Sequence, residues 1–373
     1  MIKKIIAQLK YGAKKYITYI PRIFNVNLLD KEKTLEKLEK SKIYFSEEEV
    51  VELSPVQVYG ESSVDYQTVQ IVKSSPSIVY ELKPSKKVTV LAFGGVKLDN
   101  TILNLDFGSA EYIRSLFKRG KRSKIHTEIC IPLWSHYWGG GYYDYIMFIY
   151  LKILLIKSVL NESDFKIAKF VYPVFGTPFE RDLFELAGLS NEQVINSRLY
   201  DVKADKYYVV PNVTWCYPNK KNILLLKQLS LSLNIPKHQD QELIFISRKV
   251  RRRLSNEVEI VEILKEHNFT FIEDKPRSVA DQISLYKNAK VIIGPHGASF
   301  SNIIWCDPGT KLVELFSNGY DSPNFRYLTK ILELKYYAIF ENGVKETHYT
   351  NLYNDSYIEP NNFKIALSSI LND

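Results

Sequence analysis

The sequence has few of the features that mark membrane-embedded, disulfide-bonded or metal-binding proteins. No run of about eighteen consecutive apolar residues occurs along its 373 residues, so we expect no membrane-spanning helix. Its three cysteines, Cys130, Cys216 and Cys306, lie far apart, and their spacing fits neither a disulfide framework nor a metal site. We therefore expect a protein of a reducing, cytoplasmic compartment that has no structural metal.

Motifs for several other classes of ligand are also missing. There is no Gly-x-Gly-x-x-Gly dinucleotide motif and no phosphate-loop lysine motif. The net charge of +8 favours an anionic partner, but no signature of an RNA- or DNA-binding module accompanies it. We therefore expect no nucleic-acid partner, and we expect Arg251 and Arg252 of the short arginine run to face solvent.

The N-terminal segment combines lysines with regularly spaced isoleucines and leucines. This pattern, in residues 2–20, predicts a basic amphipathic helix. Such a helix can lie on the inner face of a cell membrane or pack on the protein itself, and the sequence leaves both alternatives open. The segment lacks the continuous apolar core and cleavage site of a secretory signal.

The second half of the chain alternates between apolar strands and helices. We expect strands at 242–246, 269–273, 291–293 and 311–316, and helices that begin near Ser255 or Asn256 and at Ser278. Strands that alternate with helices of this length indicate a parallel, doubly wound sheet. The sequence thus predicts an α/β domain in this half of the chain.

The stretch VIIGPHGASFSNIIW, residues 291–305, carries the strongest site signal. A buried strand runs into a turn of small residues that includes Gly294, His296, Gly297 and Ala298. The bare backbone N–H groups at the start of the following helix favour a phosphate, and His296 can donate to a phosphate oxygen. A tight strand-to-helix connection with a satisfied histidine is the alternative interpretation of this motif alone.

Two further polar residues are expected at the same sheet edge. Arg248 follows the strand 242–246, and Glu314 lies near the end of the strand 311–316. Ligands of doubly wound sheets bind outside the carboxyl ends of the strands. We therefore expect Arg248 to contact the anion and Glu314 to accept hydrogen bonds from ribose hydroxyls, with a surface acid at the strand end as the alternative for Glu314.

These residues, with their neighbours, resemble glycosyltransferase family 61, and in particular its bacterial capsular-polysaccharide type. The matching segments, in chain order, are Ser247-Arg248, Arg253 to Glu257, Ser278 to Gln282, Gly294 to Ala298 with Asn302, and Pro308-Gly309 with Val313 to Leu315. The resemblance implies an inverting, metal-independent transferase of the GT-B type, with two Rossmann-like domains facing a cleft. It further implies that the nucleotide sugar, a UDP-sugar in our expectation, contacts Arg253 and Asn302 in addition to the residues already named.

A transferase of this kind must stabilise the departing nucleotide diphosphate. Many glycosyltransferases use a divalent metal held by an Asp-x-Asp motif, and this sequence contains no Asp-x-Asp. Arg248, Arg253, His296 and the N–H groups of Gly297 and Ala298 can supply the positive charge instead. We therefore expect neither a metal nor a cofactor.

The general base is expected in the first half of the chain. A glycine loop, residues 139–141, leads into an apolar helix whose first turn contains Asp144. Members of the resembled family usually have a histidine at the place that Asp144 occupies, so a carboxylate would have to deprotonate the acceptor hydroxyl. His136, eight residues earlier, is the competing candidate for the base. For each of the two residues, a purely structural role without a part in catalysis is the alternative interpretation.

The expected domain boundaries follow from composition and turn signals. Residues 1–60 form the basic helix and an irregular segment, residues 61–215 form an acceptor-side Rossmann-like domain, and residues 223–350 form the nucleotide-sugar domain. The residues 211–222, rich in proline and asparagine, read as the interdomain linker. The final segment, 351–373, contains a helix that is expected to cross back onto the first domain.

Two functions remain open at this stage. The first is a glycosyltransferase that moves a hexose or pentose to a glycan or lipid-linked saccharide in surface or capsular polysaccharide synthesis. The second is a non-catalytic relative that binds nucleotide sugar or glycan, an alternative that the aspartate at position 144 keeps open. Donor turnover would distinguish the two.

Overall fold

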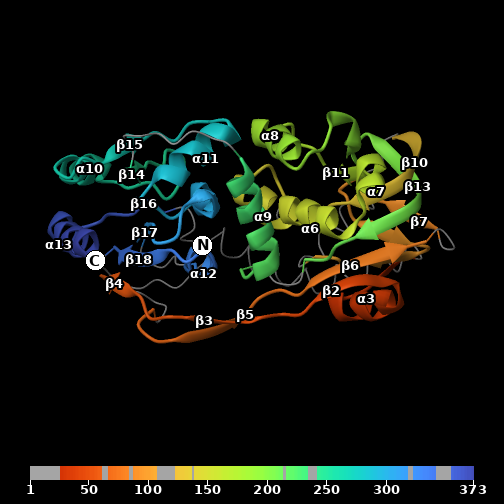
Figure 1. The fold of residues 1–373 in the computed structure, drawn as a ribbon, viewed down its shortest axis with the longest axis horizontal. Coiled ribbons are helices and arrows are strands. Elements are labelled where there is room, and N and C mark those ends of the chain that lie inside the picture. Colours follow the sequence, from red (N-terminus) through yellow and green to blue (C-terminus); the bar gives the residue numbers. More distant parts are fainter. Residues whose placement is uncertain are drawn as a thin grey trace, which may run out of the picture. The chain divides into compact units, whose positions relative to one another are not determined.

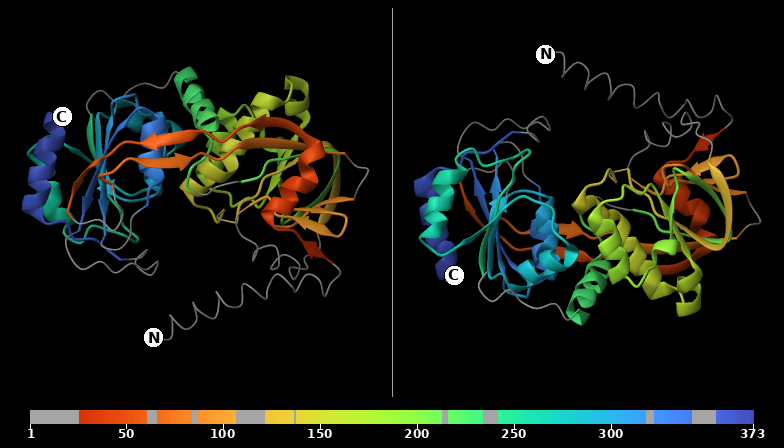
Figure 2. Two further views of the ribbon diagram at one scale, coloured as in Figure 1. Left: turned by 90° about the horizontal axis from the view of Figure 1, so that it is seen from below. Right: turned by 90° about the horizontal axis from the view of Figure 1, so that it is seen from above.

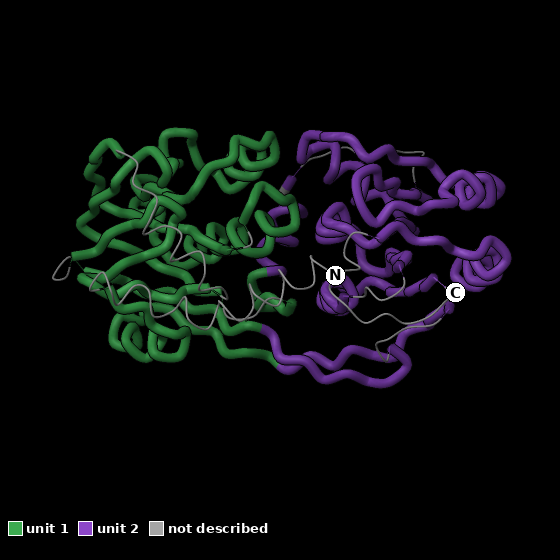
Figure 3. Tube along the Cα trace, turned by 180° about the vertical axis from the view of Figure 1, so that it is seen from behind, with its two compact units in different colours: residues 1–49, 75–222 green, residues 50–74, 223–373 purple. Residues whose placement is uncertain are grey.

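The computed structural model divides the chain into two compact units. It describes residues 26–60, 66–83, 87–106, 122–136, 138–212, 216–233, 242–317, 322–341 and 354–373. Unit 1 comprises residues 1–49 and 75–222, and unit 2 comprises residues 50–74 and 223–373 (Figure 3). The predicted N-terminal basic helix lies outside the described residues.

Unit 2 is built on a six-stranded sheet in which every neighbouring pair is parallel (Figure 1). The order is β15 (Thr270–Ile272), β14 (Leu243–Ile246), β16 (Val291–Pro295), β17 (Lys311–Phe316), β18 (Lys335–Phe340) and β4 (Gln57–Tyr59). The four strands predicted from the second half of the sequence are confirmed. Their near-continuous apolar composition suits strands that are covered on both faces.

Helices cover both faces of this sheet. The helices α10 (Glu257–Lys265) and α13 (Pro360–Asn372) lie on one face, and η4 (Ala298–Trp305) and α12 (Asn324–Ile331) lie on the other (Figure 2). The helix α11 (Val279–Asn288) packs beside η4, and its cap Ser278 accepts a hydrogen bond from the N–H of Asp281, as predicted. The helix expected after Gly297 is a 3₁₀ helix rather than an α-helix.

Unit 1 contains a second six-stranded sheet and a four-stranded one. The larger sheet has the order β12 (Val194–Asn196), β11 (Lys169–Tyr172), β10 (Ser123–Pro132), β13 (Tyr200–Val209), β6 (Ser77–Leu82) and β2 (Lys42–Ser46). Its first four strands are parallel, whereas β6 and β2 run antiparallel to their neighbours. The smaller sheet has the order β1 (Asn27–Leu28), β9 (Thr101–Leu103), β8 (Val96–Leu98) and β7 (Val88–Val90).

The helices of unit 1 include one irregular helix that matters for the site. The helix α5 (Tyr142–Tyr145) continues through a π-helical turn, η2 (Ile146–Tyr150), into α6 (Leu151–Val159). The other helices among the described residues of unit 1 are α3 (Lys31–Leu38), η1 (Glu39–Ser41), α7 (Glu162–Ile167), α8 (Pro178–Leu186) and η3 (Asn191–Gln193). The capping box predicted at the start of α8 is present, formed by Thr177 and Glu180. A π-turn is uncommon and is often found at functional sites.

The chain exchanges segments between its two halves in a way that the sequence did not indicate. Residues 50–74 carry the hairpin β3 (Val50–Leu53) and β5 (Gln70–Lys73) and also β4, which adds the outer strand to the sheet of unit 2. The helix α9 (Lys220–Ser232) begins within residues 211–222, the segment expected as the linker. The boundary between the two units falls after residue 222, inside this helix. The N-terminal segment therefore contributes to both units and is not a separate piece.

The C-terminal helix differs from its expected position. The helix α13 packs with α10 against the sheet of unit 2, and Phe363, Leu367 and Ile370 are buried in that core. The backbone bridge between Leu254 and Ser356 fixes the chain that leads into α13. The helix therefore completes unit 2 and does not cross back onto unit 1, because its apolar face matches the sheet beside it.

No helix among the described residues is both long enough and apolar enough to cross a membrane.

The packing of α13 predicts unequal effects of two substitutions on one helix. Phe363 is fully buried, whereas Ile365 is 66% exposed. We expect Phe363→Ala to lower the free energy of unfolding by about 3–5 kcal/mol and Ile365→Ala to change it by less than about 0.5 kcal/mol, as measured by urea denaturation. Equal losses in the two variants would contradict the placement of α13 on unit 2.

Candidate functional site

The first candidate site lies at the carboxyl ends of three neighbouring strands of unit 2. Arg248 follows β14, His296 follows β16, and Glu314 lies within β17. The parallel register places Gly294 beside Glu314, so the turn after β16 begins next to this carboxylate. The structure thus brings together at one sheet edge the residues that were predicted there from the sequence.

Glu314 is a fully buried carboxylate with two protein partners. Its Oε1 lies 2.6 Å from Nδ1 of His296, and its Oε2 accepts a hydrogen bond of 2.7 Å from the hydroxyl of Tyr336. A carboxylate with no exposed surface and both oxygens engaged is not placed to bind ribose hydroxyls. The structure therefore assigns Glu314 a different task, which is to hold the imidazole of His296.

His296 is itself buried and held on several sides. Its ring stacks on Phe316, with centroids 5.3 Å apart, and makes a tilted contact with Phe325. Burial lowers the pKa of His296 below its ordinary value, and the positive charges of Arg252 and Arg248 act in the same direction against the opposing effect of Glu314. A neutral ring that donates from Nδ1 to Glu314 carries its lone pair at Nε2.

Arg248 and Gly297 are fitted to each other. The guanidinium donates from Nη1 to the carbonyl oxygen of His296 at 2.7 Å and from Nε to the carbonyl oxygen of Arg251 at 2.6 Å. A β-carbon on Gly297 would overlap this guanidinium. The φ of Gly297 is −175°, an extended conformation that any residue can adopt. Glycine is therefore required here because a side chain would have no space, and not because of the backbone conformation.

Gly294 permits a similar close approach inside the sheet. A β-carbon at this position would lie 2.6 Å from the carbonyl oxygen of Ile246 on the neighbouring strand β14. The glycines of the turn therefore let β14, β16 and the Arg248 side chain converge beneath the histidine.

The arginine run 251–253 is arranged differently from the expectation. Arg253 pairs with Asp355, with Nη2 and Nε at 2.6 and 3.0 Å from its Oδ2, and so fastens the loop to the chain before α13. Arg252 is partly buried, and its charge reaches His296. Arg252, expected to face solvent, is therefore a site residue, whereas the guanidinium of Arg253 is engaged in an ion pair.

Arg252 also has an unusual backbone conformation. Its φ of 54° lies in the left-handed region, which costs a residue with a β-carbon roughly 1–2 kcal/mol. Strain of this kind persists where the surrounding structure enforces it, and it is frequent at ligand-binding sites.

Asn302 and Ala298 have different roles in the 3₁₀ helix. The amide of Asn302 donates to Oε1 of Gln282 and to the carbonyl oxygen of Ser299, and its Oδ1 accepts from Trp305. Asn302 is buried and holds η4 against α11, so its hydrogen-bonding groups are used within the fold. Ala298 is half-buried and begins η4 directly after Gly297.

A second candidate site lies in unit 1, around a buried carboxylate that the sequence analysis missed. Asp106 is fully buried, and its Oδ2 lies 2.9 Å from Nδ1 of His136 and also accepts from the backbone N–H of His136. Its Oδ1 accepts a hydrogen bond of 2.9 Å from the amide of Asn212. The aspartate therefore fixes both the ring and the backbone of the histidine.

The charge of Asp106 is stabilised by its surroundings. Burial alone would raise the pKa of Asp106, but the hydrogen bonds from His136 and the positive charge of Lys152 hold it below its ordinary value. Lys152 is buried as well and donates to the carbonyl oxygen of Trp134 at 2.7 Å. Burial lowers the pKa of Lys152 to about 8, with Asp106 opposing the shift.

Asp144, the other candidate base, lies in the first turn of α5. Its Oδ2 would be 2.8 Å from a β-carbon on Gly141, so the carboxylate folds back over the glycine that begins the helix. An acid in this position is favoured by the positive end of the helix. Asp144 is half-buried and belongs to unit 1, as His136 does.

The residues that sequence reasoning missed are of three kinds. Tyr336 is a buried partner of Glu314 and lies 22 residues from it in the sequence, and Asp106 is a buried partner of His136 and lies 30 residues from it. Lys152 lies in the apolar helix α6, which also contains Lys157, so the sequence alone does not single it out. No sequence signal distinguishes Arg252 from Arg251 and Arg253, because its positive φ is visible only in the structure.

No group of three or more histidines, cysteines, aspartates or glutamates that could hold a metal ion occurs within the described ranges.

Comparisons with known proteins place most of this chain in one sequence family. The model of the family described as Glycosyltransferase 61 matches residues 59–313, which include the carboxyl ends of β14 and β16 and the Asp106–His136 pair. A β-1,2-xylosyltransferase, RCN11, of Oryza sativa subsp. japonica is 30% identical over 104 residues, covering 25% of this chain and 19% of that protein. A β-1,2-xylosyltransferase of Arabidopsis thaliana is 36% identical over 62 residues, covering 17% of this chain and 12% of that protein. The matched stretches thus span about a fifth or less of either relative.

The charges around His296 predict opposite pKa changes in two variants. We expect NMR titration to give a pKa below 6.5 for His296. Replacing Arg252 by glutamine should raise this pKa, because a repelling charge is lost, and Glu314→Gln should lower it further. Arg251→Gln, in the same loop but exposed, is the matched control and should leave the pKa unchanged.

The same shift determines how the stability of unit 2 depends on pH. An unfolded histidine takes up a proton near pH 6.5, while His296 in the fold stays neutral to lower pH. Unit 2 should therefore lose stability as the pH falls from about 6.5 to the folded pKa. A His296 pKa at or above 6.5, or equal effects of the two arginine variants, would contradict this account.

Proposed function

We propose that this chain, which belongs to the glycosyltransferase 61 family, is an inverting, metal-independent glycosyltransferase that moves a sugar from a UDP-sugar to a glycan acceptor. The observation that carries the proposal is the group formed by His296, Arg248 and Gly297 at the carboxyl edge of a parallel sheet, inside the region that matches the family. The names of the two plant relatives support a pentose, such as xylose, as the transferred sugar.

On the donor side, we propose that unit 2 binds the nucleotide sugar. Arg248 and Arg252 would neutralise the diphosphate, and the backbone N–H groups at the start of η4 would donate to its oxygens. The ring of His296, held by Glu314 and stacked on Phe316, would face the same oxygens through Nε2, where the negative charge of the diphosphate would favour a proton. Gly294 and Gly297 keep the surface free of side chains that would obstruct the approach.

Metal independence is proposed from the charge that the chain itself provides. The sequence contains no Asp-x-Asp motif, and the donor edge instead presents two arginines beside the histidine. Fixed positive groups that are in place before the reaction stabilise a leaving diphosphate without the cost of reorienting water.

On the acceptor side, we propose His136 as the general base, with Asp106 as its positioning residue. Asp106 accepts from Nδ1, which leaves the lone pair of the neutral ring at Nε2, where it can take a proton. Asp144 is the second candidate, because its carboxylate is half-buried in the neighbouring helix turn. Lys152 and Asn212 hold Asp106 in its charged form and thus support the first assignment.

The proposed reaction is a single displacement. The base takes the proton of the acceptor hydroxyl, the hydroxyl oxygen forms a bond to the anomeric carbon from the face opposite the leaving group, and the bond from that carbon to the diphosphate oxygen breaks. The electron pair of the broken bond leaves with the UDP, and the arginines stabilise its negative charge. The configuration at the anomeric carbon is therefore inverted.

We further propose a GT-B-type arrangement in which unit 1 serves the acceptor and unit 2 the donor. Both units contain a largely parallel α/β sheet, which supports this proposal. The sequence resemblance supports a glycan or lipid-linked saccharide of a surface or capsular polysaccharide as the acceptor. The basic N-terminal segment supports a cytoplasmic protein that meets the membrane at its inner face.

The donor assignment predicts stabilisation by UDP in the absence of metal. We expect UDP at 100 times its dissociation constant to stabilise the protein by about 2.7 kcal/mol in a thermal-shift assay with EDTA. Arg248→Met should weaken UDP binding roughly ten- to hundredfold, because a charged hydrogen bond contributes about 1.5–3 kcal/mol. Arg251→Met, an exposed neighbour, is the control. A shift that requires Mn²⁺ would overturn metal independence.

The base assignment predicts a separation of turnover from binding. We expect His136→Asn to lower kcat about 10²–10⁴-fold while UDP binding stays unchanged, measured as UDP release from a panel of UDP-sugars with a glycan acceptor. Asp106→Asn should lower kcat and alter its pH profile, because the tautomer of His136 is no longer fixed. Loss of turnover in Asp144→Asn but not in His136→Asn would make Asp144 the base. Absence of any donor turnover would favour the non-catalytic alternative.

A further inference from the structure

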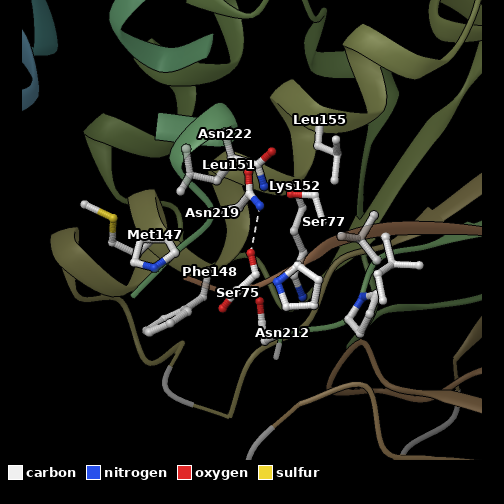
Figure 4. Close-up of a pocket in the computed structure, with 15 residues that line it drawn as sticks. Ser75, Ser77, Met147, Phe148, Leu151, Lys152, Leu155, Asn212, Asn219 and Asn222 are labelled. Carbon is white, nitrogen blue, oxygen red and sulfur yellow. Dashed lines mark hydrogen bonds between the residues drawn. The ribbon is translucent and has the colours of Figure 1, made fainter. Parts of the chain in front are cut away.

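Unit 1 contains a pocket that the proposed reaction does not yet use. It lies between the start of β6, the π-turn with α6, and the residues before and at the start of α9, and it opens to solvent. Figure 4 shows Met147 and Phe148 on one side and Ser77 and Lys152 on the other. Asparagines occupy three further lining positions: Asn212, Asn219 and Asn222.

Ser77 is the most informative residue of this pocket. The residue is 2% exposed, and its hydroxyl has no hydrogen-bond partner in the part of the chain that the structure describes. Burying an unpaired hydroxyl costs about 1–3 kcal/mol. A ligand hydroxyl or carbonyl in the pocket would supply the missing partner.

Two asparagines add hydrogen-bonding groups to the same space. The amide of Asn222 makes no hydrogen bond to the described residues, and the amide nitrogen of Asn212 is taken by Asp106, which leaves its Oδ1 as an acceptor. Asn219 differs from these two, because it donates to the carbonyl oxygen of Ser75 and accepts from the N–H of Lys221. The pocket thus offers a hydroxyl, an amide and an amide oxygen.

The opposite side of the pocket is apolar and is shaped by the irregular helix. Met147 and Phe148 belong to the π-turn, and Leu151 and Leu155 continue the same wall along α6. An apolar wall that faces a few placed polar groups is the usual lining of a small-molecule site.

The charge of the pocket favours a neutral ligand. Among the described residues that line it, Lys152 is the one ionisable residue, and its ammonium already donates to the carbonyl oxygen of Trp134 and interacts with the charge of Asp106. Lys152 and Asn212 both belong to the group around Asp106 that holds His136. A ligand in the pocket would therefore contact residues that also support the proposed base.

We propose that this pocket binds one neutral, hydroxyl-rich sugar ring of the acceptor, with its hydroxyls on Ser77 and Asn222 and its apolar face on Phe148. The identification of the ligand as the acceptor rests on the proposed glycosyltransferase function, whereas sugar binding itself does not require turnover. A sugar in the pocket gives the hydroxyl of Ser77 a hydrogen-bond partner and lies beside the Asp106–His136 group.

The test measures sugar binding without a donor. Saturation-transfer NMR with methyl glycosides of xylose, glucose, galactose, mannose and N-acetylglucosamine should detect binding of at least one at millimolar concentration. Ser77→Ala should weaken that binding roughly fivefold, yet leave the melting temperature of the free protein equal or higher, because an unpaired buried hydroxyl is removed. Met147→Trp, which fills the pocket, should abolish binding.

Ser46 provides the matched control. It pairs with Ser77 across β2 and β6, and its hydroxyl is likewise buried and without a partner among the described residues, but it does not line the pocket. Ser46→Ala should therefore leave sugar binding unchanged. Equal effects of the two serine variants, no binding of any glycoside, or competition by inorganic phosphate would overturn the proposal.

Turnover separates this proposal from the proposed function. Sugar binding that Met147→Trp abolishes, in a protein without transferase activity, would leave the pocket proposal standing and remove the proposed function. Transfer to a glycan that proceeds unchanged in Met147→Trp would remove the pocket proposal alone.

Discussion

The hydrogen bond between His296 and Glu314 is the interaction on which the candidate donor site depends. The carboxylate has no exposed surface, and it accepts from the imidazole on one oxygen and from Tyr336 on the other. A buried carboxylate without such partners would be costly, so the three side chains must be positioned together. The hydrogen bond and the stacking on Phe316 fix the orientation of the ring, and the hydrogen bond from Arg248 to the backbone carbonyl oxygen of His296 fixes the turn that contains Gly297.

Unit 1 repeats this arrangement with different residues. Asp106 is buried, accepts from the ring and backbone of His136, and keeps its charge because Lys152 and Asn212 are close. In each unit a histidine is thus held by a fully buried carboxylate from another segment of the sequence. Such a carboxylate selects the tautomer, so the chemistry of each ring is decided by a residue behind it.

The two sites differ in the electrostatic field around the histidine. The charges of Arg248 and Arg252 act on His296 and favour an anionic ligand, whereas Asp106, beside His136, offsets the charges of Lys31 and Lys152. A diphosphate therefore suits the edge of the sheet in unit 2, and a neutral hydroxyl compound suits unit 1. The unpaired hydroxyl of Ser77 and the wall formed by the π-turn extend the second site into a pocket that is open to solvent.

The sequence by itself determined the strands of the parallel sheet in unit 2 and the approach of Arg248, Gly294, His296 and Glu314, because parallel strands end at a common edge. Periodicity and capping residues report such local structure well. Only the tertiary structure decided that Glu314 is buried against His296, that the charge of Arg252 acts on His296 while Arg253 pairs with Asp355, and that β4 and α13 complete unit 2. These features depend on partners many residues away, and a sequence pattern carries no information about which distant side chain satisfies a buried charge.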